Sequence, residues 1–327
     1  MSTSTLEPAR TASKRRKREL GDGPELHTHK AIGVHKKKLN PGRIIAWAVL
    51  ILFMVVTLFP FYWMVRTAFS TTTSLAAEAS NLLPADFTLG AIKRVLGLQS
   101  FEESLAQGGS GASMDFLLFM RNSLIVSTVV TICQVACCSM AAYAFSRLRW
   151  PGRDAVFFAF LTALMIPPVF TMLPNFVLMK DLGLINTFLG IMLPTMFMTP
   201  FAVFFMRQFF LGIPREIEES AAIDGAGHWK RFTRIVLPMS SAPLITLALL
   251  TFITTWNDYM WPLLIARQPA VETLTVALGI FKGQTPQSGP DWAGLMAAAL
   301  FAALPVILLY LLLGKRLINS IGFSGIK

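Results

Sequence analysis

The segment Pro214-Arg-Glu-Ile-Glu-Glu-Ser-Ala-Ala-Ile-Asp-Gly-Ala226 is a polar interruption between two long apolar blocks of the sequence. Proline is well tolerated at the start of a helix, where its missing N–H costs little. Glu216, Glu218 and Glu219 follow within the next turns, where carboxylates interact favourably with the positive end of the helix dipole. The segment therefore predicts a short helix that begins next to Pro214.

The dipeptide Asp224-Gly225 is typical of a turn or of a helix end. We expect a second short helix at about 227–236, ending before Pro238, because proline interrupts helical hydrogen bonding. A simple connection between two apolar blocks needs no pair of helices joined by a bend. The segment at 210–239 therefore predicts a docking element.

The composition places this docking element in a membrane protein. Hydrophobic residues make up 54% of the 327 residues, charged residues only 14%, and the mean hydropathy is +0.57. Soluble domains usually carry about 25% charged residues, whereas a bilayer-spanning helix needs roughly 20 mostly apolar ones. We predict an all-α membrane domain at 44–327, after a basic, disordered tail at 1–43. Its six transmembrane helices are expected at about 44–65, 123–145, 155–178, 188–209, 240–261 and 293–313.

The distribution of basic residues predicts the orientation in the membrane. Of the 29 Lys and Arg residues, 22 lie in the tail, the 146–154 and 207–238 segments and the C-terminus, and 7 lie in the other connections. Loops rich in Lys and Arg stay in the cytoplasm, so both termini and the docking element should be cytoplasmic in a multi-pass protein of the cell membrane. The net charge of +11 follows from this membrane topology, because the charges lie on loops between the apolar blocks. Membrane lipid is a predicted partner, and nucleic acid is not.

No resident cofactor or metal is predicted for this chain. Cys133, Cys137 and Cys138 lie in one apolar block and read as packing residues. The sequence has no G-x-x-x-x-G-K-[ST] motif, because Gly314-Lys315 is followed by arginine and no glycine stands five residues before Gly314. The chain alone therefore cannot cradle ATP phosphates in this way.

The docking element resembles the EAA loop of ABC importer permeases, whose pattern is P-x-E-[LI]-x-E-[AS]-A-x-[IV]-D-G-A followed by F-x-x-I-x-L-P. This resemblance implies a type I ABC importer permease fold, with a two-helix coupling loop that lies in a cleft of a separate ATPase. Glu219 and Gly225 would be the central coupling residues. The positions that match are Pro214, Glu216, Glu219, Ala221, Asp224, Gly225, Ala226, Phe232, Ile235, Leu237 and Pro238, with Ser220 in place of an alanine.

Two further stretches, Ala141–Arg153 and Leu182–Thr187, are similar to maltose-type carbohydrate permeases, and a third, Trp256–Leu263, resembles the smaller permease of the pair. Glycerol-phosphate importers share these motifs, so that alternative stays open. The resemblance implies alternating access and several partners. These are a second permease subunit, an ATPase dimer that binds ATP and Mg, and an extracytoplasmic solute-binding protein.

The candidate solute pathway is a cluster of aromatic and polar residues near the end of the fifth span. Aromatic rings cover the apolar faces of sugars, and amides or hydroxyls bind sugar hydroxyls. An aromatic belt at the membrane interface is the alternative explanation. The candidates are Trp256, Asn257, Asp258 and Tyr259, with Trp261 beside them and Asn175 in the third span.

Two other functional classes fit the sequence less well. A secondary transporter would place ionisable residues inside its spans, yet Arg207 and Asp258 lie toward span ends. A membrane-embedded lipid phosphotransferase needs further paired aspartates after Asp224-Gly225, and none follow at the required spacing. Prolines inside the spans mark either a pathway or ordinary kinks.

Overall fold

The computed structural model describes residues 41–77, 81–84, 86–109, 114–283 and 290–321. The tail predicted at 1–43 lies outside these residues except for 41–43, which begin the first helix. The described chain is helical throughout and contains no strand. Its α-helices are α1 (Pro41–Ala68), α2 (Thr72–Ala77), α3 (Gly90–Val95), α4 (Phe101–Ala106), α5 (Phe116–Arg147), α6 (Arg153–Thr162), α7 (Pro168–Asp181), α8 (Phe188–Met196), α9 (Pro200–Leu211), α10 (Arg215–Ile223), α11 (His228–Arg231), α12 (Leu237–Met239), α13 (Ser241–Trp256), α14 (Met260–Ile265), α15 (Leu274–Gly283) and α16 (Trp292–Ile321).

Three of these helices, α1, α5 and α16, are each long and apolar enough to cross a membrane. Three bent pairs also pass this test when each pair is taken together, which raises the number of spans to as many as six. The pairs are Arg153–Met165 with Pro168–Asp181, bent by 101°, Phe188–Met196 with Pro200–Leu211, bent by 42°, and His228–Met239 with Ser241–Trp256, bent by 79°.

Proline explains the sharpest of these bends. A residue that precedes proline is disfavoured in the α conformation. Ile166 and Pro167, which precede Pro167 and Pro168, are accordingly extended, with ψ of 114° and 136°. The helix stops after the 3-10 turn Ala163–Met165 and restarts at Pro168, where a missing N–H costs little.

The chain falls into two units, residues 1–54 and residues 55–327, and we describe each by itself. The described part of the first unit is the beginning of α1, whose side chains are exposed from Pro41 to Met54. Exposed apolar side chains on a helix of this length suit a lipid environment.

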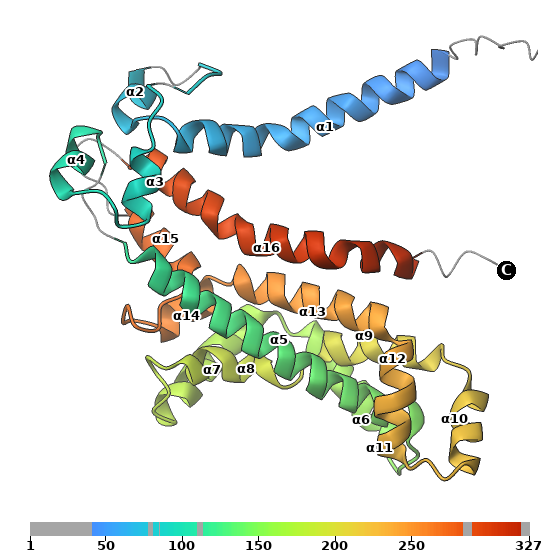
Figure 1. Cartoon of the computed structure of the whole chain (residues 1–327). Coiled ribbons are helices and arrows are strands. Elements are labelled where there is room, and N and C mark those ends of the chain that lie inside the picture. Colours follow the sequence, from blue (N-terminus) through green and yellow to red (C-terminus); the bar gives the residue numbers. More distant parts are fainter. Residues whose placement is uncertain (1–40, 78–80, 85, 110–113, 284–289, 322–327) are drawn as a thin grey trace, which may run out of the picture. The chain divides into compact units, whose positions relative to one another are not determined.

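Helix α5 is the centre of the second unit and packs against α8, α9 and α13 (Figure 1). Apolar clusters follow one another along it. Phe116 and Phe119 pack with residues of α13 and α16, Val126 and Val130 pack with α8, and Cys138 belongs to a cluster with α9. In Figure 1 the short helices α3 and α4 lie near the beginning of α5, and α10 and α11 lie near its end.

A buried ion pair joins the short helix α3 to the beginning of α16. Arg94 Nε lies 2.9 Å from Asp291 Oδ2, and the two side chains are 6% and 1% exposed. Asp291 Oδ1 accepts hydrogen bonds from Arg94 Nη2, from the Thr72 hydroxyl and from the backbone N–H of Gly294. One carboxylate thus caps α16 and holds α2 and α3 against it.

Candidate coupling loop and membrane cavity

The docking element consists of two helical arms joined by a glycine turn. Helix α10 ends at Ile223, and Gly225 follows in the left-handed conformation with φ of +78°. The N–H of Gly225 donates to Ala222 O at 3.0 Å, and the N–H of Ala226 donates to Ala221 O at 2.9 Å. These two bonds form a Schellman motif, in which glycine is strongly favoured because it has no Cβ to clash.

The second arm is longer than the sequence suggests. Helix α11 continues through a π-helical turn, Phe232–Val236, into α12, which ends at Met239. The prediction that this helix stops before Pro238 is therefore wrong. Proline clashes with the carbonyl of the residue four positions earlier, here Arg234, and the wider π turn accommodates the ring at this point.

Large apolar side chains are exposed at the tip of the loop. Ile223 is 88% exposed and Trp229 is 67% exposed, on either side of Gly225. Glu216 and Glu219 are also exposed, along α10. Apolar side chains that protrude from a polar, two-helix loop are typical of a surface that binds another protein.

The base of the loop is held by a buried ion pair that the sequence did not reveal. Arg147 Nε, at the end of α5, lies 2.8 Å from Glu218 Oε1, and the side chains are 6% and 7% exposed. Arg147 Nη2 also donates to the backbone carbonyls of Phe210 and Ile213. The Tyr143 hydroxyl donates to Glu218 Oε2 at 3.3 Å.

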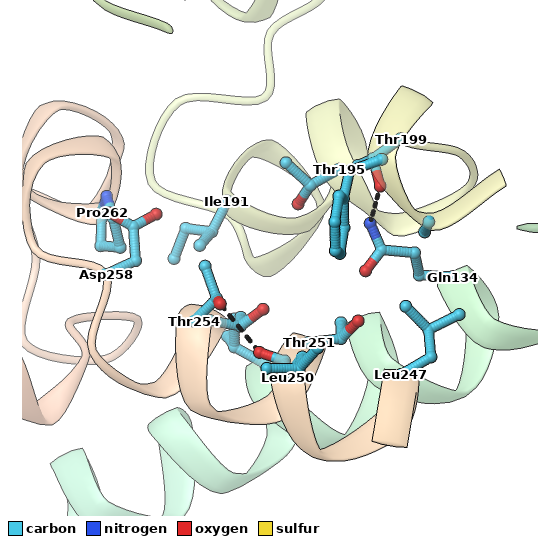
Figure 2. A pocket seen from close by; sticks show the side chains of 14 residues that line it. Gln134, Ile191, Thr195, Thr199, Leu247, Leu250, Thr251, Thr254, Asp258 and Pro262 are labelled. Carbon is cyan, nitrogen blue, oxygen red and sulfur yellow. Dashed lines mark hydrogen bonds between the residues drawn. The ribbon is translucent and has the colours of Figure 1, made fainter. Parts of the chain in front are cut away.

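A cavity of about 400 Å³ lies between α5, α8, α9 and α13 (Figure 2). This volume falls within the range of small-molecule sites. Its polar lining consists of hydroxyls, one amide and one carboxylate. These groups belong to Thr195, Thr199, Thr251, Thr254, Thr255, Gln134 and Asp258.

Two hydrogen bonds fix part of this lining, and Figure 2 shows both. Gln134 Nε2 on α5 donates to Thr199 Oγ1, which precedes α9, at 3.0 Å. Thr254 donates to Leu250 O within α13 at 2.8 Å. Asp258 lies beside Pro262 at one end of the labelled row, and Gln134 lies toward the other, with the threonines of α13 between them. The cavity is therefore a hydroxyl-rich slot with an acid at one end.

Of the residues predicted for the solute pathway, Asp258 lines the cavity, whereas the Trp261 indole donates to the backbone carbonyls of Gly190 and Ile191. Trp256 is 5% exposed and stacks on Phe252 at 5.7 Å, within the apolar cluster shared with α16. The amide of Asn257 is exposed and donates to Ile253 O. Tyr259 packs next to α15, and Asn175 is half-buried on α7. The residues predicted as one cluster thus lie apart: in the apolar core, at exposed positions and, for Asp258, in the cavity.

The threonines of the cavity have a spacing in the sequence that indicates a polar face within the membrane domain. Thr251, Thr254 and Thr255 have the spacing i, i+3, i+4, which places them along one face of a helix in an apolar span. Such a polar stripe predicts a cavity or a packed interface within the membrane domain. Thr195 and Thr199, four residues apart, form a similar pair.

Within the described ranges, no group of three or more His, Cys, Asp or Glu side chains is placed to hold a metal ion. Cys133, Cys137 and Cys138 have free thiols on α5, and Cys138 is fully buried in its apolar cluster.

Curated relatives cover most of the chain. A permease protein of an sn-glycerol-3-phosphate transport system from Agrobacterium fabrum is 30% identical over 288 residues, which are 86% of this chain and 96% of that protein. An arabinooligosaccharide transport system permease from Halalkalibacterium halodurans is 30% identical, covering 89% of this chain and 99% of that one. The trehalose/maltose transport system permease of Thermococcus litoralis is 29% identical, covering 85% and 94%.

The fold is similar to that of a solved bacterial ABC transporter involved in the import of the acidic polysaccharide alginate. The TM-score is 0.71 at 23% identity, covering 84% of this chain and 96% of the matched chain. Residues 135–322 match the family described as the inner membrane component of binding-protein-dependent transport systems. The chain belongs to this family of ABC importer permeases, whose members are membrane translocation subunits and not enzymes.

Proposed function

We propose that this chain is the smaller permease subunit of an ATP-driven, binding-protein-dependent importer of a sugar or sugar derivative, working by alternating access. The observation that carries the proposal is the coupling loop, residues 210–239, with its glycine turn and its exposed tip at Ile223 and Trp229. An ATPase dimer that binds ATP and Mg docks there. A second permease completes the pathway, and an extracytoplasmic solute-binding protein delivers the solute.

Within this proposal α6 with α7 and α8 with α9 each form one span, and α13 forms the fifth span after the cytoplasmic loop. With α1, α5 and α16 the chain then has the six spans of a type I importer permease, and both termini are cytoplasmic. Glu219 is exposed on α10 and available to a basic residue of the ATPase. Gly225 supplies the turn that lets the tip enter a narrow cleft. The remaining coupling residues are Glu216, Ser220, Ala221, Asp224, Ala226, Phe232 and Pro238.

The topology predicts a specific pattern for a reporter enzyme that is active only outside the cytoplasm. Fusions after Asp181 and Gln268 should be active, and fusions after Gly152 and Gly225 should be inactive, because α6 with α7, α8 with α9, and α13 each cross the membrane once. The fusion after Asp181 is the sharpest of these. An inactive reporter there would mean that α6 and α7 re-enter on the side they left, and activity after Gly225 would contradict the docking of a cytoplasmic ATPase.

The cavity favours a neutral, polyhydroxylated solute. Threonine hydroxyls and the Gln134 amide both donate and accept hydrogen bonds, as sugar hydroxyls require. Asp258 is the ionisable side chain in the lining, and it is an acid. A phosphate or carboxylate on the solute would instead call for arginine or lysine. This chemistry supports a sugar over glycerol phosphate, although both kinds of importer occur among the relatives.

Removing two cavity hydroxyls tests this pathway. Thr251→Val together with Thr255→Val keeps the side-chain shape and should raise the KM for sugar uptake about tenfold, because each lost hydrogen bond is worth roughly 0.5–1.5 kcal/mol. Thr246→Val is the matched control, since Thr246 lies on the same helix, bonds to Ala242 O and does not line the cavity. An unchanged KM in the double variant, with normal assembly, would place the solute elsewhere.

The substrate class is tested with the purified solute-binding protein of the same transport system. We expect neutral sugars to bind and then to stimulate ATP hydrolysis by the reconstituted transporter. Binding and stimulation by glycerol phosphate, with no response to any neutral sugar, would overturn the assignment to sugars and leave the importer assignment intact.

A further inference from the structure

The ion pair between Arg147 and Glu218 is buried, although it lies beside a loop whose tip is exposed. The guanidinium of Arg147 contacts the Glu218 carboxylate and the carbonyls of Phe210 and Ile213. Arg147 therefore binds both α10, the first arm of the loop, and the segment that connects α9 to α10. A planar guanidinium offers several donors in a fixed geometry, which lysine cannot reproduce.

Tyr143, one turn earlier on α5, connects the same helix to both arms. Its hydroxyl donates to Glu218 on α10, and its ring centre lies 5.0 Å from that of Phe232 on the second arm. Phe232 is 4% exposed and packs in the apolar cluster with Tyr143. Both arms of the loop thus rest on the last turns of α5, while Ile223 and Trp229 protrude beyond them.

Helix α5 also forms a wall of the cavity. Gln134 lines the cavity and bonds to Thr199, and it precedes Tyr143 by nine residues on the same unbroken helix. With a rise of 1.5 Å per residue, the two positions are about 14 Å apart along the helix axis. One continuous helix thus connects the base of the loop with the wall of the cavity.

We propose that α5 transmits the motion of the coupling loop to the cavity wall, and that Arg147, Glu218 and Tyr143 form the contact through which it does so. This inference rests on the proposed docking of an ATPase at the loop tip. The three residues are positioning residues, since they hold the loop against α5 and lie outside the cavity lining.

The test measures solute transported per ATP hydrolysed, in the complete reconstituted transporter. Glu218→Gln keeps the shape of the side chain and removes its charge. We expect the ATPase to remain bound and active while transport per ATP falls about tenfold, within the range that interacting pairs show in double-mutant cycles. Glu218→Asp, which keeps the charge, should retain more of the coupling than Glu218→Gln. Tyr143→Phe, which removes a single hydroxyl, should give a smaller decrease.

The control is a more exposed ion pair at the beginning of α6. Arg153 and Asp154 are 24% and 75% exposed and 2.9 Å apart, so Arg153→Gln with Asp154→Asn should leave transport per ATP unchanged. Wild-type coupling in Glu218→Gln and in Tyr143→Phe would overturn the inference. Loss of the ATPase from Glu218→Gln would overturn it too, by making Glu218 a docking residue. Failure of the proposed function would appear separately, as wild-type protein without ATP-driven uptake.

Discussion

Gly225→Val is expected to abolish ATP-driven uptake while leaving the subunit inserted in the membrane. Residue 225 has φ of +78°, and a side chain in this conformation costs about 1–2 kcal/mol per residue. A Cβ at this position meets no atom of the chain within 4 Å, so the fold of the membrane domain should survive. The substitution therefore strains the turn itself, which we propose must enter a cleft of the ATPase.

Gly227→Val provides the matched control for this prediction. Gly227 is also exposed and also has open space around its Cβ position, but its φ is −65°. Any residue adopts that conformation, so this variant should keep most of the uptake. Uptake in membrane vesicles and co-purification of the ATPase are the measurements. Wild-type values of both for Gly225→Val would show that the turn has no role in coupling.

The second large effect concerns stability. Asp291→Ala should lower the free energy of unfolding by about 3–5 kcal/mol, because it leaves the buried guanidinium of Arg94 without its partner. It also removes the acceptor at the beginning of α16. Thermal unfolding of the purified complex in detergent measures the loss. Asp154→Ala, at an exposed ion pair, should cost no more than about 1 kcal/mol.

A double variant separates the charge from the packing. Arg94→Met with Asp291→Leu removes both charges and should be more stable than Asp291→Ala alone, since two apolar side chains leave no buried charge unpaired. If Asp291→Ala unfolds at the wild-type temperature, the ion pair does not hold α3 to α16.

The sequence was most informative where the signal is local. Apolar blocks of the required length correspond to α1, α5 and α16, and the turn at Asp224-Gly225 follows from residue chemistry alone. The bends between helices were harder to predict from the sequence. Pro167 and Pro168 mark an interruption, but the angle of 101° between the two helices depends on their distant partners, because α6 packs against α9 and α7 against α14.

The coupling loop shows why the orientation of a helix face is harder to predict. In a soluble helix the apolar residue is expected inside and the carboxylate outside. Here Ile223 is exposed and Glu218 is buried, because Arg147 supplies a partner from a distant part of the chain. An ion pair between residues this far apart in the sequence cannot be recognised from the local pattern around either residue.

The cavity was missed for a related reason. Trp256 and its neighbours combine aromatic and polar groups in one short stretch, yet that stretch is where α13 ends, so consecutive side chains point in different directions. The cavity is assembled from threonines on separate helices, and only their periodic spacing within α13 was visible in the sequence.

The most direct test of the account is the energy source of transport in proteoliposomes that contain both permeases and the ATPase, with the solute-binding protein added outside. We predict that uptake requires ATP on the ATPase side and the loaded binding protein, and that it continues when ionophores collapse all ion gradients. Uptake that proceeds without ATP and follows a proton or sodium gradient would contradict it and identify a secondary transporter.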